Sequence, residues 1–322
     1  MTVLLTAADL AEVLVVEDVI ESVAQAFGAY SGGRTQTPLR VGVEPPGVDG
    51  VLLAMPCAVA PNALGAKVVS VFRDNPRKGL PTVTSIYLLG DYETGAPLAI
   101  MDGGYLTALR TAAGSAVATR YLAAPNADSL GVFGTGVQAR FHVETIRRVR
   151  PLKRVLVAGT SSEKAGRFAE WVSQTSGLAA EPAPPEDVSA ASILAACTTS
   201  PMPVVVDACV RPGAHVNAVG AFTPTTRELP TELVSRARVY VDTRAGAFAE
   251  AGDLLLPVQE GRFALDRVAG EIGELVLGAA SAEPAEVTIY KSVGAAFLDA
   301  ATARLAYDQA RAKGLGTEFT FA

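Results

Sequence analysis

The sequence has few of the residues that hold metal ions or disulfide bonds. It contains 3 cysteines, Cys57, Cys197 and Cys209, and 2 histidines, His142 and His215, among 322 residues. The cysteines are widely spaced and form no Cys-x-x-Cys pair, which argues against a disulfide framework and against a zinc site. Neither histidine has a partner motif, so we expect both to be structural. No metal site is predicted, and acid–base chemistry is expected to rest on lysine or carboxylates.

An excess of positive charge and long apolar runs are also missing. The 27 lysines and arginines are outnumbered by 33 aspartates and glutamates, so no basic excess exists to neutralise nucleic-acid phosphates. No uncharged apolar run is long enough to span a bilayer, and the first residues lack the basic-then-apolar pattern of a signal peptide. We therefore expect a soluble cytoplasmic protein that binds neither nucleic acid nor membrane.

A glycine turn is the most informative motif that is present. Residues 129–133 form a short apolar run typical of a buried strand, and Gly134-Thr135-Gly136-Val137-Gln138-Ala139 follows it at the start of a predicted helix. This is the context that a dinucleotide fingerprint requires. Gly134 permits the tight turn, Gly136 lets the backbone approach a pyrophosphate, and Ala139 takes the place of the third glycine. We expect a nucleotide at the helix N-terminus.

The pattern before residue 124 differs from the pattern after it. The first 30 residues have helical periodicity, short strands without intervening helices follow, and Asp102 is a plausible N-cap for a helix that reaches Leu122. These first strands are predicted at residues 39–43, 51–55, 66–72 and 83–89. From Ser129, strands and helices alternate, which is typical of a doubly wound parallel sheet. The alternating strands are predicted at 129–133, 154–158, 203–207, 215–219 and 238–242, and the helices at 137–149, 163–175, 188–196, 229–236 and 245–250.

This change predicts an α/β protein with two domains. A Rossmann dinucleotide-binding domain is expected at residues 124–291, with a loop at 178–186. The amphipathic helix at 292–313 is expected to pack back on the first part of the chain. The substrate-binding and dimerisation domain would then be discontinuous, α+β in type, and composed of residues 1–123 and 292–322.

The end of the second Rossmann strand bears on the choice of coenzyme. In NAD-specific folds an acid usually stands there and binds the ribose 2′-hydroxyl. Here the strand is followed by Gly159, Thr160, Ser161 and Ser162, and no acid occurs before Glu163. The three hydroxyls, with Lys164 nearby, are able to hydrogen-bond a 2′-phosphate, although the arginine that often binds this phosphate is missing. We expect NADP(H) rather than NAD(H).

Three cations in the first domain are candidates for binding an anionic substrate. Lys67 interrupts an apolar strand, and Arg110 stands in a helix of otherwise small residues. Burying either charge is costly unless an anion pairs with it. Arg40 ends the segment Thr37-Pro38-Leu39-Arg40. Arginine suits a carboxylate, whereas lysine suits both a carboxylate and the polarisation of an imine.

Several motifs together resemble the ornithine cyclodeaminase/μ-crystallin family. They occur in the family's order over nearly the whole chain. The motifs are Gly65-Ala66-Lys67-Val68, Asn75-Pro76-Arg77-Lys78-Gly79-Leu80-Pro81-Thr82, Asp102 with Leu106-Thr107-Ala108-Leu109-Arg110-Thr111-Ala112-Ala113, the glycine turn, Asn217-Ala218-Val219-Gly220, Glu228-Leu229, Ala251-Gly252-Asp253-Leu254 and Lys291-Ser292-Val293-Gly294.

The resemblance implies a homodimer formed through the first domain's sheet. It also implies that Arg40, Lys67 and Arg110 hold the α-carboxylate of a substrate, that Thr111 reaches the cofactor phosphates, and that Gly294 lies near the nicotinamide. Val219 belongs to the same cofactor-binding set. Thr135, Val137 and Gln138 join it through the glycine turn.

The chain departs from true cyclodeaminases at both of their carboxylates. Phe222 stands where those enzymes have an aspartate, and the stretch Leu52-Leu53-Ala54 stands where they have a glutamate just before the pair that matches Met55-Pro56. We therefore expect a ketimine-reductase-like enzyme. It would reduce Δ1-pyrroline-2-carboxylate or Δ1-piperideine-2-carboxylate with NAD(P)H, with Lys67 catalytic and with Met55 and Phe222 lining an apolar pocket. The alternatives are an L-alanine or N-alkyl amino acid dehydrogenase, an ornithine cyclodeaminase, and a non-catalytic NADP-binding protein.

Overall fold

The computed structural model describes residues 1–283 and 285–321. The chain divides into two compact units, one of residues 1–110 and 295–322 and the other of residues 111–294. The division falls inside helix α3 (Gly103–Leu122), and Asp102 Oδ1 accepts a hydrogen bond of 2.7 Å from Tyr105 N at the start of that helix. Among the described residues, no helix has the length and apolarity needed to cross a membrane.

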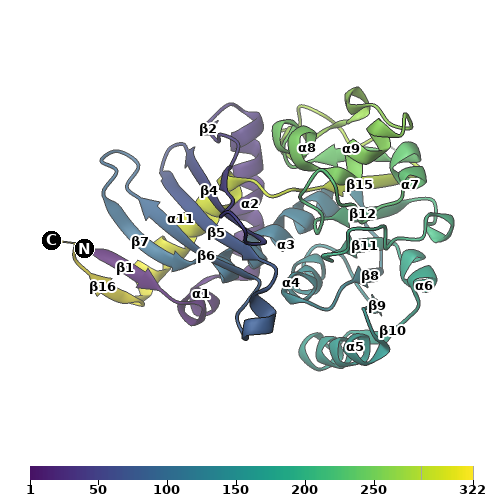
Figure 1. Ribbon diagram of the computed structural model, residues 1–322, viewed down its shortest axis with the longest axis horizontal. Helices are drawn as coiled ribbons and strands as arrows, with labels where there is room; N and C mark the ends of the chain where they lie inside the picture. Colours follow the sequence, from purple (N-terminus) through teal and green to yellow (C-terminus); the bar gives the residue numbers. More distant parts are fainter. Residues whose placement is uncertain (284, 322) are drawn as a thin grey trace. The chain divides into compact units, whose positions relative to one another are not determined.

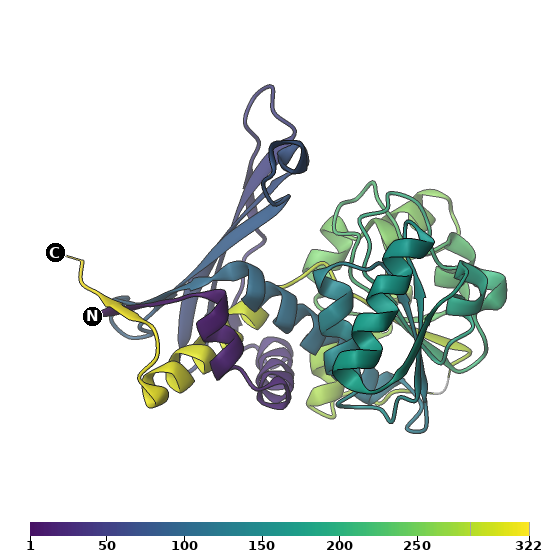
Figure 2. The same cartoon turned by 90° about the horizontal axis from the view of Figure 1, so that it is seen from below.

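The first unit is a mostly antiparallel sheet with helices on one face (Figures 1 and 2). The strands follow the order β16-β1-β7-β6-β5-β4-β2, and β3 pairs with β4. The strands are β1 Thr2–Leu5, β2 Thr35–Gln36, β3 Val41–Val43, β4 Gly50–Val59, β5 Ala63–Phe72, β6 Val83–Gly90, β7 Pro97–Asp102 and β16 Thr317–Phe319. Besides the start of α3, the helices are α1 Ala7–Val13, α2 Val16–Ser31, the 3-10 turn η1 Asn75–Lys78 and α11 Ala296–Lys313.

Alternation along the strands separates an inner and an outer face of this sheet. Helices α2 and α11 pack on the inner face, where Phe297 of α11 stacks on Tyr30 of α2 at 4.8 Å between ring centroids. On the outer face Ile86 and Leu88 of β6 are 52% and 42% exposed. Among the described residues of this unit, no α-helix covers that face, as Figure 2 shows.

The second unit is a parallel sheet with helices on both faces, as a doubly wound fold requires (Figure 1). Its strand order is β10-β9-β8-β11-β12-β15-β13-β14. The strands are β8 Ser129–Phe133, β9 Arg154–Ala158, β10 Ala179–Pro182, β11 Ile193–Ala196, β12 Ala214–Ala218, β13 Arg238–Val241, β14 Gly270–Glu271 and β15 Val287–Lys291. The helices are α4 Val137–Ile146, α5 Ser162–Ser176, α6 Pro185–Ser189, α7 Thr231–Arg236, α8 Arg244–Glu250, α9 Gly252–Gln259 and α10 Ile272–Val276. The α/β class with a Rossmann sheet is confirmed.

The expected strand at 203–207 and the expected helix at 188–196 are wrong. Helix α6 ends at Ser189, and the fourth strand is β11, which lies fully buried between β8 and β12. A buried parallel strand is apolar at every position, so its short run of alanine and leucine resembles a helix in sequence. The valines at 203–207 lie outside the sheet, where Val204 N donates to the Glu228 carbonyl at 2.8 Å.

Smaller differences occur near the ends of the chain and in the predicted loop. The N-terminal segment begins with strand β1 before its helices, and strand β10 lies inside the loop expected at 178–186. The last helix, α11, begins at Ala296 rather than at Ser292.

Candidate active site

A buried lysine lies at the centre of the inner face of the first unit's sheet. In the strand register Lys67 of β5 stands directly between Met55 of β4 and Tyr87 of β6. Lys67 is 2% exposed, and the Met55 and Tyr87 side chains are buried beside it. A charge at this position needs an anionic partner, because an isolated buried ammonium is costly.

That partner is Asp299 of helix α11, which the sequence analysis did not identify. Asp299 Oδ2 lies 2.8 Å from Lys67 Nζ, and Asp299 Oδ1 accepts a hydrogen bond of 2.7 Å from Arg110 Nε. Arg110 and Asp299 are buried as well. The available signal was the position of Asp299 on the apolar face of α11, in helical register with Ala296, Ala303 and Ala306.

The three charges shift one another's proton affinity. Burial and the charge of Arg110 lower the pKa of Lys67 to about 8, against the raising effect of Asp299. Burial alone would raise the pKa of Asp299, but the charges of Arg110 and Lys67 lower it overall. The cluster therefore carries two positive charges and one negative charge near neutral pH. One further anion would balance it.

Two buried polar atoms beside this cluster have no hydrogen-bond partner within the described chain. They are Arg110 Nη1 and Tyr87 Oη. Buried polar groups are almost always paired, so an orphaned guanidinium nitrogen indicates a place for a ligand. Half-buried Arg40 is near enough for its charge to lower the pKa of Lys67 further. The structure thus brings the charges of Arg40, Lys67 and Arg110 together, with Met55 next to Lys67 in the sheet.

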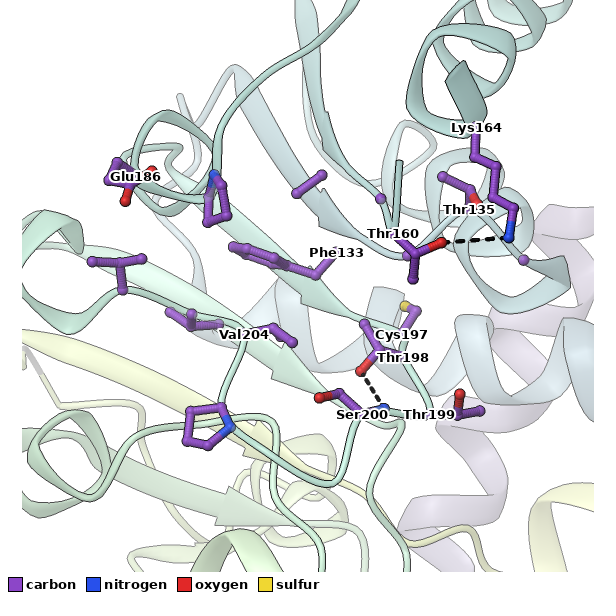
Figure 3. A pocket seen from close by; sticks show the side chains of 18 residues that line it. Phe133, Thr135, Thr160, Lys164, Glu186, Cys197, Thr198, Thr199, Ser200 and Val204 are labelled. Carbon is purple, nitrogen blue, oxygen red and sulfur yellow. Dashed lines mark hydrogen bonds between the residues drawn. The ribbon is translucent and has the colours of Figure 1, made fainter. Parts of the chain in front are cut away.

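The second unit has a pocket at the carboxyl ends of its central strands. The pocket has a volume of about 810 Å³ and lies where β8, β9 and β11 end. Between β8 and β11 the strand order reverses, and such switch points bind ligands in open α/β sheets. Figure 3 shows Thr135, Thr160 and Lys164 gathered at one end of it.

The glycine turn fits a dinucleotide. Gly134 has φ +106°, and a Cβ there would lie 2.7 Å from the Cys197 carbonyl oxygen, so only glycine is accommodated. The Cβ position of Gly136 has open space within 4 Å, and α4 begins after Gly136 with no side-chain cap. Free N–H groups at this helix N-terminus are suited to a pyrophosphate.

The remaining predicted cofactor residues are distributed unevenly around this pocket. Thr135 and Thr160 line it, whereas Ser161 and Ser162 do not. Ser161 caps helix α5 instead, since its hydroxyl accepts from Lys164 N at 3.2 Å. Val137 and Gln138 occupy the first turn of α4, outside the lining. Thr111 lies on α3 within the second unit and is also outside the lining.

Two buried carboxylates shape the loops that follow strands β11 and β12. Glu228 accepts hydrogen bonds from Thr198 N and Gly220 N, both at 2.6 Å. Asp253 Oδ1 accepts from Glu228 N at 2.7 Å, and its other oxygen lies 2.8 Å from Lys291 Nζ. These family-motif residues thus hold the segment from Val219 to Phe222, in which Phe222 is 37% exposed.

Asp242 plays the same part for the turn at Gly294. Its Oδ2 accepts from Gly294 N at 2.8 Å and from the Ser292 hydroxyl at 2.7 Å.

Both histidines are buried and hydrogen-bonded within the second unit. His142 Nε2 bonds Ser115 Oγ at 2.8 Å, and burial lowers the pKa of His142 to about 4. Burial lowers the pKa of His215 to about 3, so both rings stay neutral near neutral pH, as structural histidines do.

Comparison with known proteins agrees with the family resemblance and with the fold. The family model described as "Ornithine cyclodeaminase/mu-crystallin family" matches residues 1–314. Delta(1)-pyrroline-2-carboxylate reductase of Bacillus cereus is 37% identical over 94% of this chain and 95% of its own length. Alanine dehydrogenase of Archaeoglobus fulgidus is 34% identical over 99% of this chain and 98% of its own.

The fold of this chain also matches that of a solved structure. Delta(1)-pyrroline-2-carboxylate reductase of Thermococcus litoralis, in complex with NADH and L-proline, superposes with a TM-score of 0.95. It is 37% identical, and the match covers 99% of this chain and 100% of that one. The chain therefore belongs to the ornithine cyclodeaminase/mu-crystallin family.

Proposed function

We propose that this protein is an NAD(P)H-dependent reductase of cyclic imino acids. Its substrate would be Δ1-pyrroline-2-carboxylate or Δ1-piperideine-2-carboxylate, and its product L-proline or L-pipecolate. The observation that carries the proposal is the buried set of Lys67, Arg110 and Asp299, which is one negative charge short of balance and leaves Arg110 Nη1 without a partner. The likeness to a reductase solved with NADH and L-proline supports it.

The residues of the site suit this reaction. Arg110 and Arg40 bind the α-carboxylate, and Lys67 stands beside them as an ammonium. A nicotinamide, when bound, would supply the hydride that the imine carbon accepts. The imine nitrogen also needs a proton, and a group with a pKa of about 8 is well placed to give one near neutral pH. Lys67 is our candidate for this proton donor.

The apolar substitutions support a substrate without a second charge. A diamino acid carries a side-chain ammonium, and such a group needs a carboxylate to pair with it. Phe222 and the stretch Leu52-Leu53-Ala54 take the places of the two cyclodeaminase carboxylates, and none of these side chains can accept a proton or pair with a cation. A ring whose only charged appendage is a carboxylate fits these residues.

The second candidate is an L-alanine dehydrogenase, which the Archaeoglobus fulgidus relative favours. The same carboxylate site would then hold pyruvate, and ammonia would supply the nitrogen. The cyclic imine is our first choice because the Bacillus cereus and Thermococcus litoralis relatives are both more similar in sequence to this chain.

We propose NADPH as the preferred coenzyme. No acid follows β9 before Glu163, and that carboxylate is paired with Arg167. Thr160 and Lys164 stand at the same end of the pocket, where Lys164 Nζ donates to Thr160 Oγ1 at 3.4 Å (Figure 3). An acid at this position would repel a 2′-phosphate, so its absence favours NADP(H) over NAD(H). Location in the cytoplasm stays a prediction from the sequence.

One assay tests the function and the coenzyme together. Purified protein is mixed with NADPH or NADH, and the absorbance of the reduced nicotinamide is followed after adding Δ1-pyrroline-2-carboxylate, Δ1-piperideine-2-carboxylate, or pyruvate with ammonia or methylamine. We expect rapid oxidation with a cyclic imine, faster with NADPH. Oxidation with pyruvate and amine alone would establish the second candidate, and no oxidation with any of them would contradict both.

We also propose a homodimer formed through the outer face of the first unit's sheet. Val68 of β5 stands between Ala54 of β4 and Ile86 of β6 in one row, and Leu88 stands between Ala66 and Ile100 in the next. These two apolar rows form a patch that no helix of the described unit covers, and a contiguous apolar patch of this kind marks an interaction surface.

Ile86→Glu is expected to convert the dimer into a monomer. A carboxylate buried in an apolar interface without a partner costs several kcal/mol, which is enough to prevent association at micromolar concentrations. Light scattering after gel filtration should give the chain mass of 33.2 kDa instead of twice that value. Val15→Glu changes an exposed valine between α1 and α2 and serves as the control. An unchanged dimer in Ile86→Glu would rule out this face.

A further inference from the structure

A second, smaller pocket adjoins the nucleotide pocket. It has a volume of about 410 Å³, and it shares Thr135, Gly136 and Lys164 with the larger one. Its other lining residues are Arg140, Arg167 and Phe168. Three of the six residues are therefore cations, and they come from two helices, α4 and α5. No such concentration of positive charge is evident in the sequence, where Arg140 is separated from Lys164 by a strand and two loops.

The cations are held in different ways. The Arg140 guanidinium lies 5.0 Å from the centroid of the Trp171 ring, which orients it by a cation–π contact without neutralising it. Within the described residues Arg140 has no carboxylate partner. Arg167 is paired with Glu163. The pocket thus holds three positive charges against one carboxylate, an excess that suits a dianion.

The place of this pocket identifies the anion. In a Rossmann fold the adenosine ribose lies at the end of the second strand, and a 2′-phosphate on it is accommodated by a nearby arginine. Here the second strand is β9, and the pocket adjoins Thr160 and Lys164, which follow it. The sequence has no arginine directly after β9, but the fold brings two from neighbouring helices.

We propose that Arg140, Lys164 and Arg167 form a subsite for the 2′-phosphate of NADPH, and that Arg140 determines the coenzyme preference. This inference rests on the proposed NADP(H) preference and names the residues that produce it. Arg140 is assigned the discrimination between NADPH and NADH because no carboxylate neutralises its charge within the described residues. The charge of Arg167, by contrast, is partly neutralised by its ion pair with Glu163.

Binding measurements test the subsite without requiring turnover. Calorimetric titration with 2′,5′-ADP and with 5′-AMP compares ligands that differ only in the 2′-phosphate. Arg140→Ala is expected to weaken the binding of 2′,5′-ADP about tenfold, the loss of one charge-assisted contact, and to leave the binding of 5′-AMP unchanged. Arg167→Ala should show a smaller loss, and Glu163→Gln should strengthen 2′,5′-ADP, because it frees Arg167.

Lys153→Ala is the matched control. It removes one exposed positive charge at the opposite end of β9, so both ligands should bind as they do to the unaltered protein. Equal losses of affinity for 2′,5′-ADP and 5′-AMP in Arg140→Ala would overturn the assignment, as would no loss for either ligand. If 2′,5′-ADP binds through Arg140 but no imine is reduced, the subsite stands and the proposed reaction falls.

Discussion

Replacing Lys67 with methionine is expected to lower kcat/KM for the cyclic imine by about 10³-fold. The substitution removes a cation that contacts the carboxylate and the proposed source of the proton, and a positioned acid alone contributes on the order of 10²–10⁴-fold. Both kcat and the affinity for the substrate should fall. Steady-state kinetics with saturating NADPH measure the two separately.

The same substitution should have little effect on folding. Arg110 and Asp299 remain as a balanced pair at 2.7 Å, and methionine fills the volume of the lysine stem with apolar atoms. Replacing one member of a buried charged group by an apolar residue is tolerated when the remaining charges balance. Lys313→Met, at the exposed end of α11, is the control for the loss of one positive charge. Turnover within threefold of the unaltered enzyme in Lys67→Met would show that Lys67 has neither role, since each is worth about tenfold or more.

Replacing Asp299 with asparagine is expected to destabilise the protein by about 3–5 kcal/mol. Asparagine keeps the size and shape of the aspartate side chain but removes its negative charge. Lys67 and Arg110 are then two buried positive charges without an anion. For a unit of this size the midpoint of thermal unfolding should fall by roughly 10 °C. Asp308→Asn, which removes an exposed carboxylate paired with Arg304 on the same helix, should shift the midpoint little.

The pH dependence of KM distinguishes the loss of the Asp299 charge from a nonspecific loss of stability. Lys67 has a pKa of about 8 in the folded protein, against 10.5 as its ordinary value, so its ammonium is lost as the pH rises through about 8. KM for the imino acid should rise above that pH. Asp299 raises the pKa of Lys67, so in Asp299→Asn the rise in KM should begin at a lower pH.

The effect on stability has the opposite sign. Because the folded pKa lies below the unfolded one, charged Lys67 opposes folding, and this cost is relieved between about pH 8 and pH 10.5. Urea unfolding across that range measures it. An Asp299→Asn variant with the stability and the KM profile of the unaltered protein would show that Asp299 does not set the charge of the cluster.

Much of the dinucleotide-binding fold could be predicted from sequence because its signals are local. The apolar run before Gly134 and the two glycines of the turn, Gly134 and Gly136, lie within a few consecutive residues. The burial of Lys67 and Arg110 could also be predicted locally, because a charged residue inside an apolar strand or a helix of small residues indicates a buried charge that needs a partner. Strand β11 was misplaced because four buried apolar residues carry no periodicity that separates a strand from a helix.

What those cations contact was decided by tertiary structure. Asp299 is 189 residues from Arg110 in the chain and reaches it only because α11 packs on the inner face of the β4–β6 strands. Arg140 and Arg167 meet at one pocket because two helices start at the same edge of a parallel sheet. Local patterns along the chain predict which residues are buried and where a glycine is needed. The partners of the buried charges follow from long-range packing, which no local pattern encodes.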